Sequence, residues 1–476
     1  MNIKTVFNTV GRVILLEAAF LLLPLIVSLI YGESCSTAFI VTAAVAAVTG
    51  FALVRLCRSE AKNLSIRDGF GIVSLSWIFI SLIGSLPFII SGEIPSFFDA
   101  FFETVSGFTT TGASILTDVE SMSHGLLFWR SFTHWLGGMG ILVFVMAIMD
   151  KAPDRSINIL RAEMPGHSVD KFTPKAKNTA KILYFIYIAF TALETVLLLA
   201  GGMPLFDSLV HALGTAGTGG FGIKADSIAS YSNYLQWVIT VFMLLFGVSF
   251  NLYYLLLLRR RKAALSSNEL WCYLGIFAVS CAVITANILP VYGNFGDALR
   301  LSAFQVSSII TTTGYATADF NLWPQLSKAV LFVLMFLGGC MGSTAGGFKM
   351  SRVTVLLQMA RNELRRSLSP RAVSAVRLNG QTLDAQAEKG VLSYLVLYIL
   401  VILAAFLLIS FEPFGFETNF TAAVSCVNNI GPGFGLIGPA SGYAAYSAFS
   451  KLVLSFAMLM GRLEIYPLLT LVMRRA

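Results

Sequence analysis

The sequence predicts an all-α integral membrane protein built from four copies of one unit: a spanning helix, a half-helix, a Gly-containing loop and a second spanning helix. Long apolar runs, the positions of the basic residues and four similar Gly-rich segments indicate this fold. Hydrophobic residues make up 56% of the 476 residues and charged residues 12%, whereas soluble domains carry about 25% charged residues. The composition excludes a disordered chain, a collagen, a disulfide scaffold and a soluble enzyme, because none of these tolerates so many uncharged runs.

An apolar helix of about 20 residues crosses the hydrocarbon core of a membrane, which is about 30 Å thick. By this measure we expect ten full spans and four apolar pieces that are too short to cross. The spans are expected near 13–31, 37–56, 69–91, 124–149, 179–201, 232–258, 269–291, 326–358, 390–411 and 444–473. The first two are extra spans in front of the repeats.

The short apolar pieces lie near residues 96–108, 204–215, 297–310 and 416–428. Each lies between two full spans, begins near an acidic residue and ends in Gly and Thr, which predicts a half-helix that enters the membrane and returns as extended chain. Non-helical backbone at that depth must be buried in protein or line water, since an unsatisfied peptide group in lipid costs several kcal/mol.

The basic residues predict the orientation in the membrane. The +8 net charge is concentrated, because 26 of the 33 Lys and Arg lie in six segments, 1–12, 55–67, 151–181, 259–262, 352–389 and 474–475. The connections between these segments carry mostly acids. Cationic flanks are retained on the cytoplasmic side. We therefore expect a multi-pass protein of the cytoplasmic (inner) membrane with both termini in the cytoplasm, and no nucleic-acid partner.

The segments that follow the half-helices resemble one another. They read TTTGA at 109–113, GTGGF at 217–221, TTTGY at 311–315 and IGPGF at 430–434. Their glycines Gly112, Gly220, Gly314 and Gly433 are taken as equivalent. This repeat predicts a two-helix extension at 1–68 and four units at 69–150, 151–262, 263–378 and 379–476.

Four re-entrant loops around one axis can point backbone carbonyls inward and replace the hydration shell of a monovalent cation. Gly permits the positive φ that such loops need, and the carboxyl ends of the half-helices add partial negative charge. A single loop of this kind could serve only close helix packing, but four at equivalent positions favour an ion path. The candidate filter residues are Thr110, Thr111, Gly112, Thr218, Gly219, Gly220, Thr312, Thr313, Gly314, Asn429, Ile430, Gly431 and Gly433.

Two further features stand out within the later spans, a glycine-rich run and a charged residue. The run from Gly338 to Lys349 holds five glycines, each of which costs a helix about 1 kcal/mol relative to Ala, so we expect a flexible break there or a Gly-rich packing seam. Arg462 lies 12 residues before Arg474, about 18 Å along a helix. A charge at that depth usually faces a partner or water. Glu464 does not share its helix face, so Arg462 either faces water or bonds a carboxylate or carbonyls.

Other motifs carry little weight. The GxGxxG pattern from Gly433 to Gly438 follows no strand, and Phe348 stands where a phosphate loop after Gly342 would need Lys. The histidines and cysteines show no metal-ligand spacing. We also expect no organic cofactor in this chain. A coupled secondary transporter is expected to consist of two halves with inverted topology, whereas this sequence contains four units of the same orientation. A membrane enzyme would need a catalytic group among the intramembrane acids Glu17, Glu194 and Glu464.

Four motifs are the most specific, namely SGFTTTGAS at 106–114, TTTGY at 311–315, GGCMGSTAGGFK at 338–349 and NNIGPG at 428–433. With these motifs the chain resembles, over essentially its whole length, the bacterial Trk/Ktr family of potassium transport proteins, and within it the TrkH-type membrane subunits. The second loop, around Gly219 and Gly220, is the loosest match.

The resemblance implies uptake of potassium and rubidium through one pore per subunit. It implies K⁺ at Thr110, Thr111, Thr218, Gly219, Thr312, Thr313, Ile430 and Gly431. It implies a gate formed by Gly338, Gly339, Gly342, Ser343, Thr344, Gly346, Gly347 and Arg462. It also implies a homodimer and a cytoplasmic TrkA-type nucleotide-binding subunit. The basic segments 150–178 and 359–389 could instead contact anionic membrane lipids.

Overall fold

The computed structural model describes residues 2–58, 65–140, 176–369 and 375–472. In these ranges the protein is helical, apart from its loops and one small antiparallel hairpin of β1 (Arg377–Leu378) and β2 (Gln381–Thr382). Six helices are long and apolar enough to cross a membrane, and one bent pair makes a seventh candidate. The predicted all-α membrane fold is confirmed.

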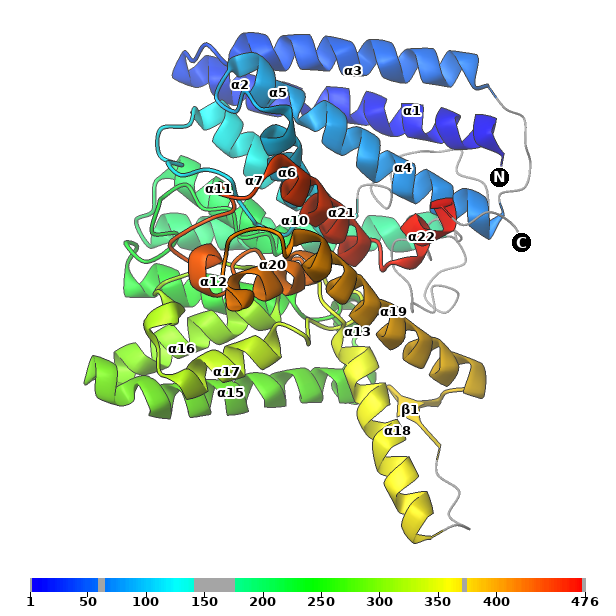
Figure 1. The fold of residues 1–476 in the computed structure, drawn as a ribbon, viewed down its shortest axis with the longest axis vertical. Helices are drawn as coiled ribbons and strands as arrows, with labels where there is room; N and C mark the ends of the chain where they lie inside the picture. Colours follow the sequence, from blue (N-terminus) through cyan, green and yellow to red (C-terminus); the bar gives the residue numbers. More distant parts are fainter. Residues whose placement is uncertain (1, 59–64, 141–175, 370–374, 473–476) are drawn as a thin grey trace.

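The two extra spans form a hairpin in front of the repeats. This hairpin comprises α1 (Ile3–Phe20), α2 (Leu22–Tyr31) and α3 (Ser36–Leu56). Helices α1 and α3 lie side by side in Figure 1, in contact at two glycines. A Cβ on Gly11 would lie 2.8 Å from the carbonyl oxygen of Gly50, and a Cβ on Gly50 would lie equally close to that of Gly11. Small residues thus bring the two backbones together, as is usual in membranes.

The four half-helices are present at the expected places. They are α6 (Phe97–Phe108), α11 (Leu205–Gly217), α16 (Phe295–Ile310) and α20 (Phe416–Asn428). Helix α6 begins at a side-chain cap, because the hydroxyl of Ser96 accepts from the amide of Asp99, and the side chain of Asn294 caps α16 in a similar way. Such caps stabilise a helix start. Over their last two turns the half-helices are buried in the protein.

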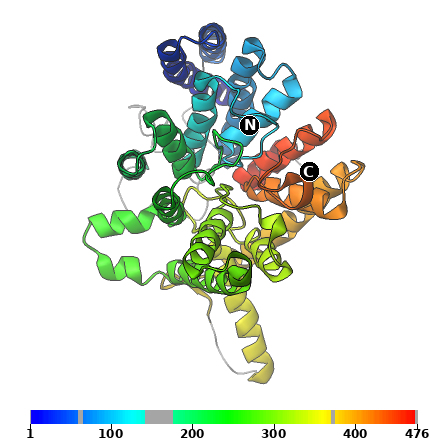
Figure 2. The same ribbon diagram turned by 90° about the vertical axis from the view of Figure 1, so that its left-hand side faces the viewer.

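Each half-helix follows a first spanning helix. These spans are α4 with α5 (Ile66–Gly84, Leu86–Ser91), α10 (Ala176–Ala200), α15 (Asn268–Tyr292) and α19 (Ala385–Ile409). Figure 2 shows the elements that follow the amino-terminal hairpin arranged in chain order around a common centre. The architecture of four repeated units around a central axis is therefore confirmed, while the chain boundaries given above stay predictions.

The second helices of the later repeats are broken. The sequence predicted a break only within the span at 326–358 and continuous spans at 232–258 and 444–473. Helix α12 (Asn233–Phe246) turns by 87° into α13 (Phe250–Leu257), which α14 (Arg261–Leu265) follows. Helix α17 (Gln325–Leu334) is separated from α18 (Met350–Leu368) by the Gly-rich run, as expected. Helix α21 (Ala448–Arg462) ends before α22 (Tyr466–Val472), because Glu464 and Ile465 have positive φ.

In the first repeat, the second helix is α7 (His124–Gly138). Residues 141–149 of the span predicted at 124–149 lie outside the described residues. Short 3-10 turns η2 (Phe320–Leu322) and η3 (Gly435–Ile437) lie in the returning loops of the last two repeats. All four second helices thus end, bend or break at the same level of the repeat.

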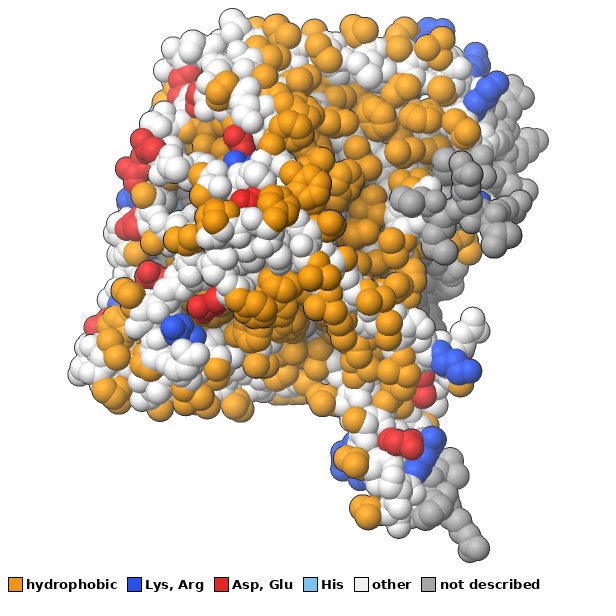
Figure 3. All heavy atoms as spheres, in the orientation of Figure 1, with side chains coloured by type: hydrophobic (Ala, Val, Ile, Leu, Met, Phe, Trp, Pro, Cys, Tyr) orange, Lys and Arg blue, Asp and Glu red, His pale blue; other side chains and the backbone are white. Residues whose placement is uncertain are grey.

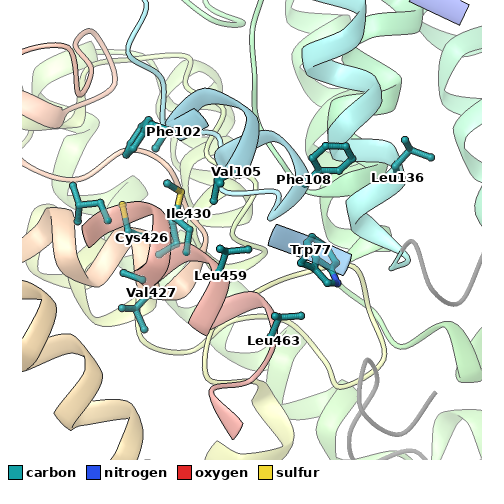
Figure 4. Close-up of a cluster of buried hydrophobic side chains, with 14 of the residues drawn as sticks. Trp77, Phe102, Val105, Phe108, Leu136, Cys426, Val427, Ile430, Leu459 and Leu463 are labelled. Carbon is teal, nitrogen blue, oxygen red and sulfur yellow. The ribbon is translucent and has the colours of Figure 1, made fainter. Parts of the chain in front are cut away.

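Apolar side chains form a broad belt across the face shown in Figure 3. Acidic side chains gather along the left edge, and Lys and Arg gather at the right edge and along the projecting helix α18. Inside the protein, apolar residues fill the space between α4, α6, α7, α20 and α21 (Figure 4), including Trp77, Phe108 and Ile430. Because Ile430 belongs to the fourth loop, the core holds that loop in place directly.

Candidate functional site

The four loops share one backbone conformation. The first residue of each central triplet is not glycine yet has φ between 54° and 57°, and these residues are Thr110, Thr218, Thr312 and Asn429. The third residue is a glycine with φ between 74° and 97°, and these are Gly112, Gly220, Gly314 and Gly431. The residue between them does not have positive φ. Alternation of positive and negative φ along the chain can turn successive peptide groups to the same side.

The register of the fourth loop differs from the prediction. Gly431, and not Gly433, is the equivalent of Gly314, because Gly431 has φ of 97° and Gly433 lacks a positive φ. A Cβ on Gly433 would meet the side chains of Ile437 and Thr421 rather than another loop. In the second loop, the triplet is Thr218, Gly219 and Gly220, which is the register taken from the sequence.

The glycines of the triplets close the loops into a ring. A Cβ on Gly112 would overlap the carbonyl oxygen of Gly219 in the next repeat. The same relation joins Gly220 to Thr313, Gly314 to Ile430 and, at 2.7 Å, Gly431 to Thr111. Each glycine therefore needs both its positive φ and its missing side chain. The fourth repeat returns to the first, so the ring is complete.

Hydroxyl groups and carbonyls around the ring are fixed by hydrogen bonds. Thr109 and Thr111 pair through their hydroxyls at 2.8 Å, and Thr311 and Thr313 pair at the same distance. The carbonyl of Gly431 accepts from the hydroxyls of Ser425 and Tyr443, each at 2.8 Å. The loops are thus supported from behind by side chains. Such support makes the positions of the ring oxygens well defined.

A cavity of 470 Å³ lies on one side of the ring and is lined by all four triplet glycines. We call it the vestibule. Loop residues around Ser114, Gly222 and Ala316, together with the segment 436–446, form its other walls. An ion in the vestibule would meet the ring directly.

A buried ion pair supports the first two loops. Arg130 of α7 lies 2.7 Å from Glu103 of α6, and both side chains are buried. Glu103 also accepts from the amide of Ile115 at 2.9 Å, and Arg130 lies 4.0 Å from the centre of the Phe221 ring. Sequence spacing does not indicate this pair, because Glu103 and Arg130 lie 27 positions apart.

On the other side of the ring lies the segment Gly338–Lys349, which we call the gate loop. It is non-helical, as predicted. The amide of Cys340 donates to the carbonyl of Gly247, where α12 ends, and the amide of Phe250 donates to the carbonyl of Gly342, both at 2.9 Å. The gate loop therefore fills the space left by the 87° bend between α12 and α13.

Arg462 lies at the same level and bonds to backbone carbonyls. Its guanidinium donates to Thr344 in the gate loop at 2.8 Å and to Gly137 and Gly138 at the end of α7, both at 2.6 Å. The structure thus supports the alternative in which Arg462 bonds to backbone carbonyls. Glu464 pairs instead with Arg352 of α18.

A small cavity of 60 Å³ lies beside this contact. It is lined by the end of α7, by the gate loop and by two cationic residues, Lys349 and Arg462. We call it the lower cavity. Among the candidate gate residues, Gly342, Ser343, Gly346, Gly347 and Arg462 line it. Gly338, Gly339 and Thr344 do not line it. Thr344 bonds Arg462 as described above, and Gly338 packs on Gly347.

The histidines have structural roles in the part of the chain that the structure describes. A ring nitrogen of His134 lies 2.7 Å from the carbonyl oxygen of Gly107, and the amide of Phe221 donates to its other nitrogen at 3.3 Å. Within the described ranges, no group of three His, Cys, Asp or Glu side chains could hold a metal ion. His167 lies outside the described residues.

A closed ring of four re-entrant loops inside a multi-pass helical membrane protein defines an ion-conducting class of transport proteins. The family model TrkH, described as "Cation transport protein", matches residues 35–291 and 292–475. The chain therefore belongs to the TrkH family.

Full-length relatives agree with this assignment. The chain is 34% identical to the Trk system potassium uptake protein TrkH of Salmonella typhimurium, over 99% of this chain and 98% of the relative. It is 32% identical to the Trk system potassium uptake protein TrkG of Escherichia coli, with the same coverage. The crystal structure of the potassium transporter TrkH from Vibrio parahaemolyticus superposes with a TM-score of 0.90 at 31% identity, covering 99% of both chains.

Proposed function

We propose that this protein takes up potassium, and also rubidium, through the ring of four loops. The observation that carries the proposal is the closed cycle in which each triplet glycine packs on a carbonyl of the next repeat. This cycle brings four sets of backbone oxygens around one axis, where they can replace the hydration shell of a potassium ion. The names of the relatives as potassium uptake proteins support the choice of ion.

The selectivity filter in this proposal consists of the four triplets. The cation contacts Thr110, Thr111, Thr218, Gly219, Thr312, Thr313, Ile430 and Gly431. The half-helices α6, α11, α16 and α20 end at these triplets, so their carboxyl ends favour a cation there. One glycine per loop is a shorter signature than that of potassium channels, and we expect moderate discrimination against sodium.

The gate loop and Arg462 close the pathway below the filter. Arg462 and Lys349 line the lower cavity together with Glu464, whose charge is paired with that of Arg352. The cavity therefore keeps a positive balance, and like charges at short range oppose passage of a cation. Opening requires the gate loop to leave this position. The loop has glycines with positive φ at Gly338, Gly342 and Gly347, which allow it to move between conformations.

Regulation is proposed to come from a separate subunit. The described ranges contain no soluble nucleotide-binding domain, so a cytoplasmic TrkA-type partner, acting on a homodimer of this chain, is the proposed sensor. The basic helix α18 and the following segment are available for that partner or for anionic lipid. With the basic segments on the cytoplasmic side, both termini face the cytoplasm.

Coupled transport is the alternative to gated diffusion. Proton coupling would need a titratable group on the ion path. Glu17 and Glu194 are fully buried and have no hydrogen-bond partner among the described residues. Neither carboxyl lines the vestibule or the lower cavity. Glu464 does line the lower cavity, but it is held in an ion pair with Arg352. Diffusion driven by the membrane potential therefore remains the preferred mechanism.

Rubidium flux into proteoliposomes tests the proposal. The purified wild type is compared with Gly314→Ser and Arg462→Ala, with and without competing sodium. We expect wild-type rubidium flux to exceed sodium flux, Gly314→Ser to lose that preference, and Arg462→Ala to raise the flux. If neither the wild type nor Arg462→Ala passes any monovalent cation in verified orientation, the proposed function is wrong.

A further inference from the structure

We propose that the backbone amide of Gly346 in the gate loop and a permeant cation compete for one oxygen, the hydroxyl oxygen of Thr312. A cation that enters the last filter position would then weaken a contact that holds the gate closed. The inference rests on the proposed function, because it assumes that the ring conducts cations. It adds a link between filter occupancy and gate position that neither element has by itself.

The contact is short and fully enclosed. The amide nitrogen of Gly346 lies 2.6 Å from Thr312 Oγ1, and both atoms are buried. A Cβ on Gly346 would lie 2.6 Å from the carbonyl oxygen of Asn428 and 3.1 Å from the Cβ of Asn429. The gate loop therefore reaches the filter at its third and fourth repeats, and only a glycine fits at this point of contact.

The three other equivalent positions of the ring lack this contact. The Thr218 hydroxyl donates to the carbonyl of Gly217 at 2.6 Å, and the Asn429 amide donates to Thr111 and Met458. The hydroxyl of Thr110 is buried without a hydrogen-bond partner in the described ranges. Of these four side chains, Thr312 is the one that accepts a hydrogen bond from the gate loop.

The N–H of Gly346 and a cation compete for the same lone pairs of the hydroxyl oxygen. The N–H of Gly346 presents positive partial charge to the lone pairs of Oγ1, and a dehydrated potassium ion presents a full positive charge to the same lone pairs. The amide proton and a cation bound to the same oxygen also repel each other, because both carry positive charge. Binding of one therefore weakens binding of the other, and thermodynamic linkage makes the effect reciprocal.

The other contacts of the gate loop do not involve the ring oxygens. Met341 donates its amide to the carboxylate of Glu269 at 2.6 Å, Thr344 accepts from Arg462, and Lys349 donates to the carbonyl of Ala345. These contacts position the two ends and the middle of the loop. Only the Gly346 contact would sense an ion in the filter. An empty filter thus favours the closed loop, and an occupied filter favours release.

Thiol modification of a residue in the gate loop measures its position. Ser343 lines the lower cavity and is replaced in a Ser343→Cys variant, in which Cys57, Cys272 and the gate-loop residue Cys340 are changed to Ala. We expect a membrane-impermeant thiol reagent applied from the gate side to react about fivefold faster in potassium than in N-methylglucamine, the factor expected from one net hydrogen bond. Rubidium flux of each variant is measured in parallel.

Three further substitutions separate the contact from general damage to the filter. Thr312→Val removes the shared oxygen at constant size, and we expect fast modification in both cations. Thr110→Val removes the equivalent hydroxyl of the first repeat, which has no contact to the gate loop, and we expect lower flux but a retained potassium effect on modification. Thr312→Ser restores the oxygen, and with it the potassium effect.

Equal modification rates in potassium and N-methylglucamine for the Ser343→Cys protein would overturn the competition. Loss of the potassium effect in both Thr110→Val and Thr312→Val would overturn it as well, because the effect would then belong to the whole ring. Both results leave rubidium flux through the wild type intact. Absence of flux in the wild type and in Arg462→Ala would instead overturn the proposed function, and this inference with it.

Discussion

The side-chain amide of Asn429 donates a hydrogen bond of 3.0 Å to the hydroxyl of Thr111 and so joins the last repeat to the first. The same amide donates to the carbonyl of Met458 in α21 at 2.9 Å. The other three repeats have a threonine where the fourth has Asn429. A threonine has one donor, whereas the amide group of asparagine has two. The ring is therefore chemically asymmetric where the chain closes on itself.

Asn429→Asp should weaken this connection between the fourth repeat and the first. A carboxylate accepts hydrogen bonds but donates none, so the acceptors on Thr111 and Met458 lose their donor and face a negative charge. We expect a loss of stability of about 2 kcal/mol and weaker discrimination of rubidium from sodium. Thermal melting and the flux ratio measure the two effects. Asn429→Thr, which keeps one donor, is the control, and a wild-type flux ratio in Asn429→Asp would contradict the role of this connection.

The register of the fourth loop gives a second prediction. Gly431→Ala places a Cβ at φ of 97° and 2.7 Å from the carbonyl of Thr111, where only backbone could yield. Gly433→Ala places its Cβ against the end of the Ile437 side chain, which can rotate. We expect Gly431→Ala to reduce the preference for rubidium over sodium much more than Gly433→Ala does. The opposite order of effects would restore the register taken from the sequence.

The half-helices could be predicted from the sequence, but the register of the fourth loop could not. Apolar runs with capping residues such as Ser96 mark a helix start locally, and the predicted bounds lie within two residues of the observed ones. The segment IGPG offers two glycines, and composition does not tell which of them has positive φ. That choice depends on the approach of the Thr111 carbonyl from a loop more than 300 residues away.

Breaks and ion pairs were harder to predict for the same reason. The bend after Phe246 has only Gly247 as a local signal, and a single glycine is tolerated in many helices. The bend is fixed by the gate loop, which bonds to Gly247 from a distant part of the chain. Likewise, Glu464 pairs with Arg352 across 112 positions. The carbonyl partners of Arg462 come from the gate loop and from α7, more than 100 positions away, so sequence spacing could not identify them.

The buried pair of Arg130 and Glu103 supports a third prediction. Glu103→Gln keeps the shape of the side chain but leaves the guanidinium without its counter-charge, which in a buried site costs about 3–5 kcal/mol. We expect a large fall in melting temperature and impaired folding in membranes. The double variant Glu103→Gln with Arg130→Met removes both charges and should recover part of the loss. A single variant as stable as the wild type would show that the pair is not essential.

The fourth prediction concerns Glu33, which lies in the loop between α2 and α3 and binds the start of α7. Its carboxylate accepts from the amides of His124 and Gly125 at 2.7 Å and 3.0 Å, and it lies 2.9 Å from a ring nitrogen of His124. Partial burial acts to raise the pKa of Glu33, but the hydrogen bonds from Gly125 and His124 outweigh it and hold the pKa below its ordinary value of 4.5. The carboxylate thus caps the positive end of a helix.

A lowered pKa in the folded state means that Glu33 stabilises the protein above pH 4.5, and that this contribution is lost as the pH falls through the folded-state pKa. Glu33→Gln should lower the stability by about 1 kcal/mol at pH 7, and the difference from the wild type should shrink below about pH 4.5. Thermal melting in detergent between pH 3 and 8 measures this difference. His124→Gln, which keeps both backbone donors, should retain most of the pH dependence. A difference that grew on acidification would have the wrong sign for a cap formed by a carboxylate.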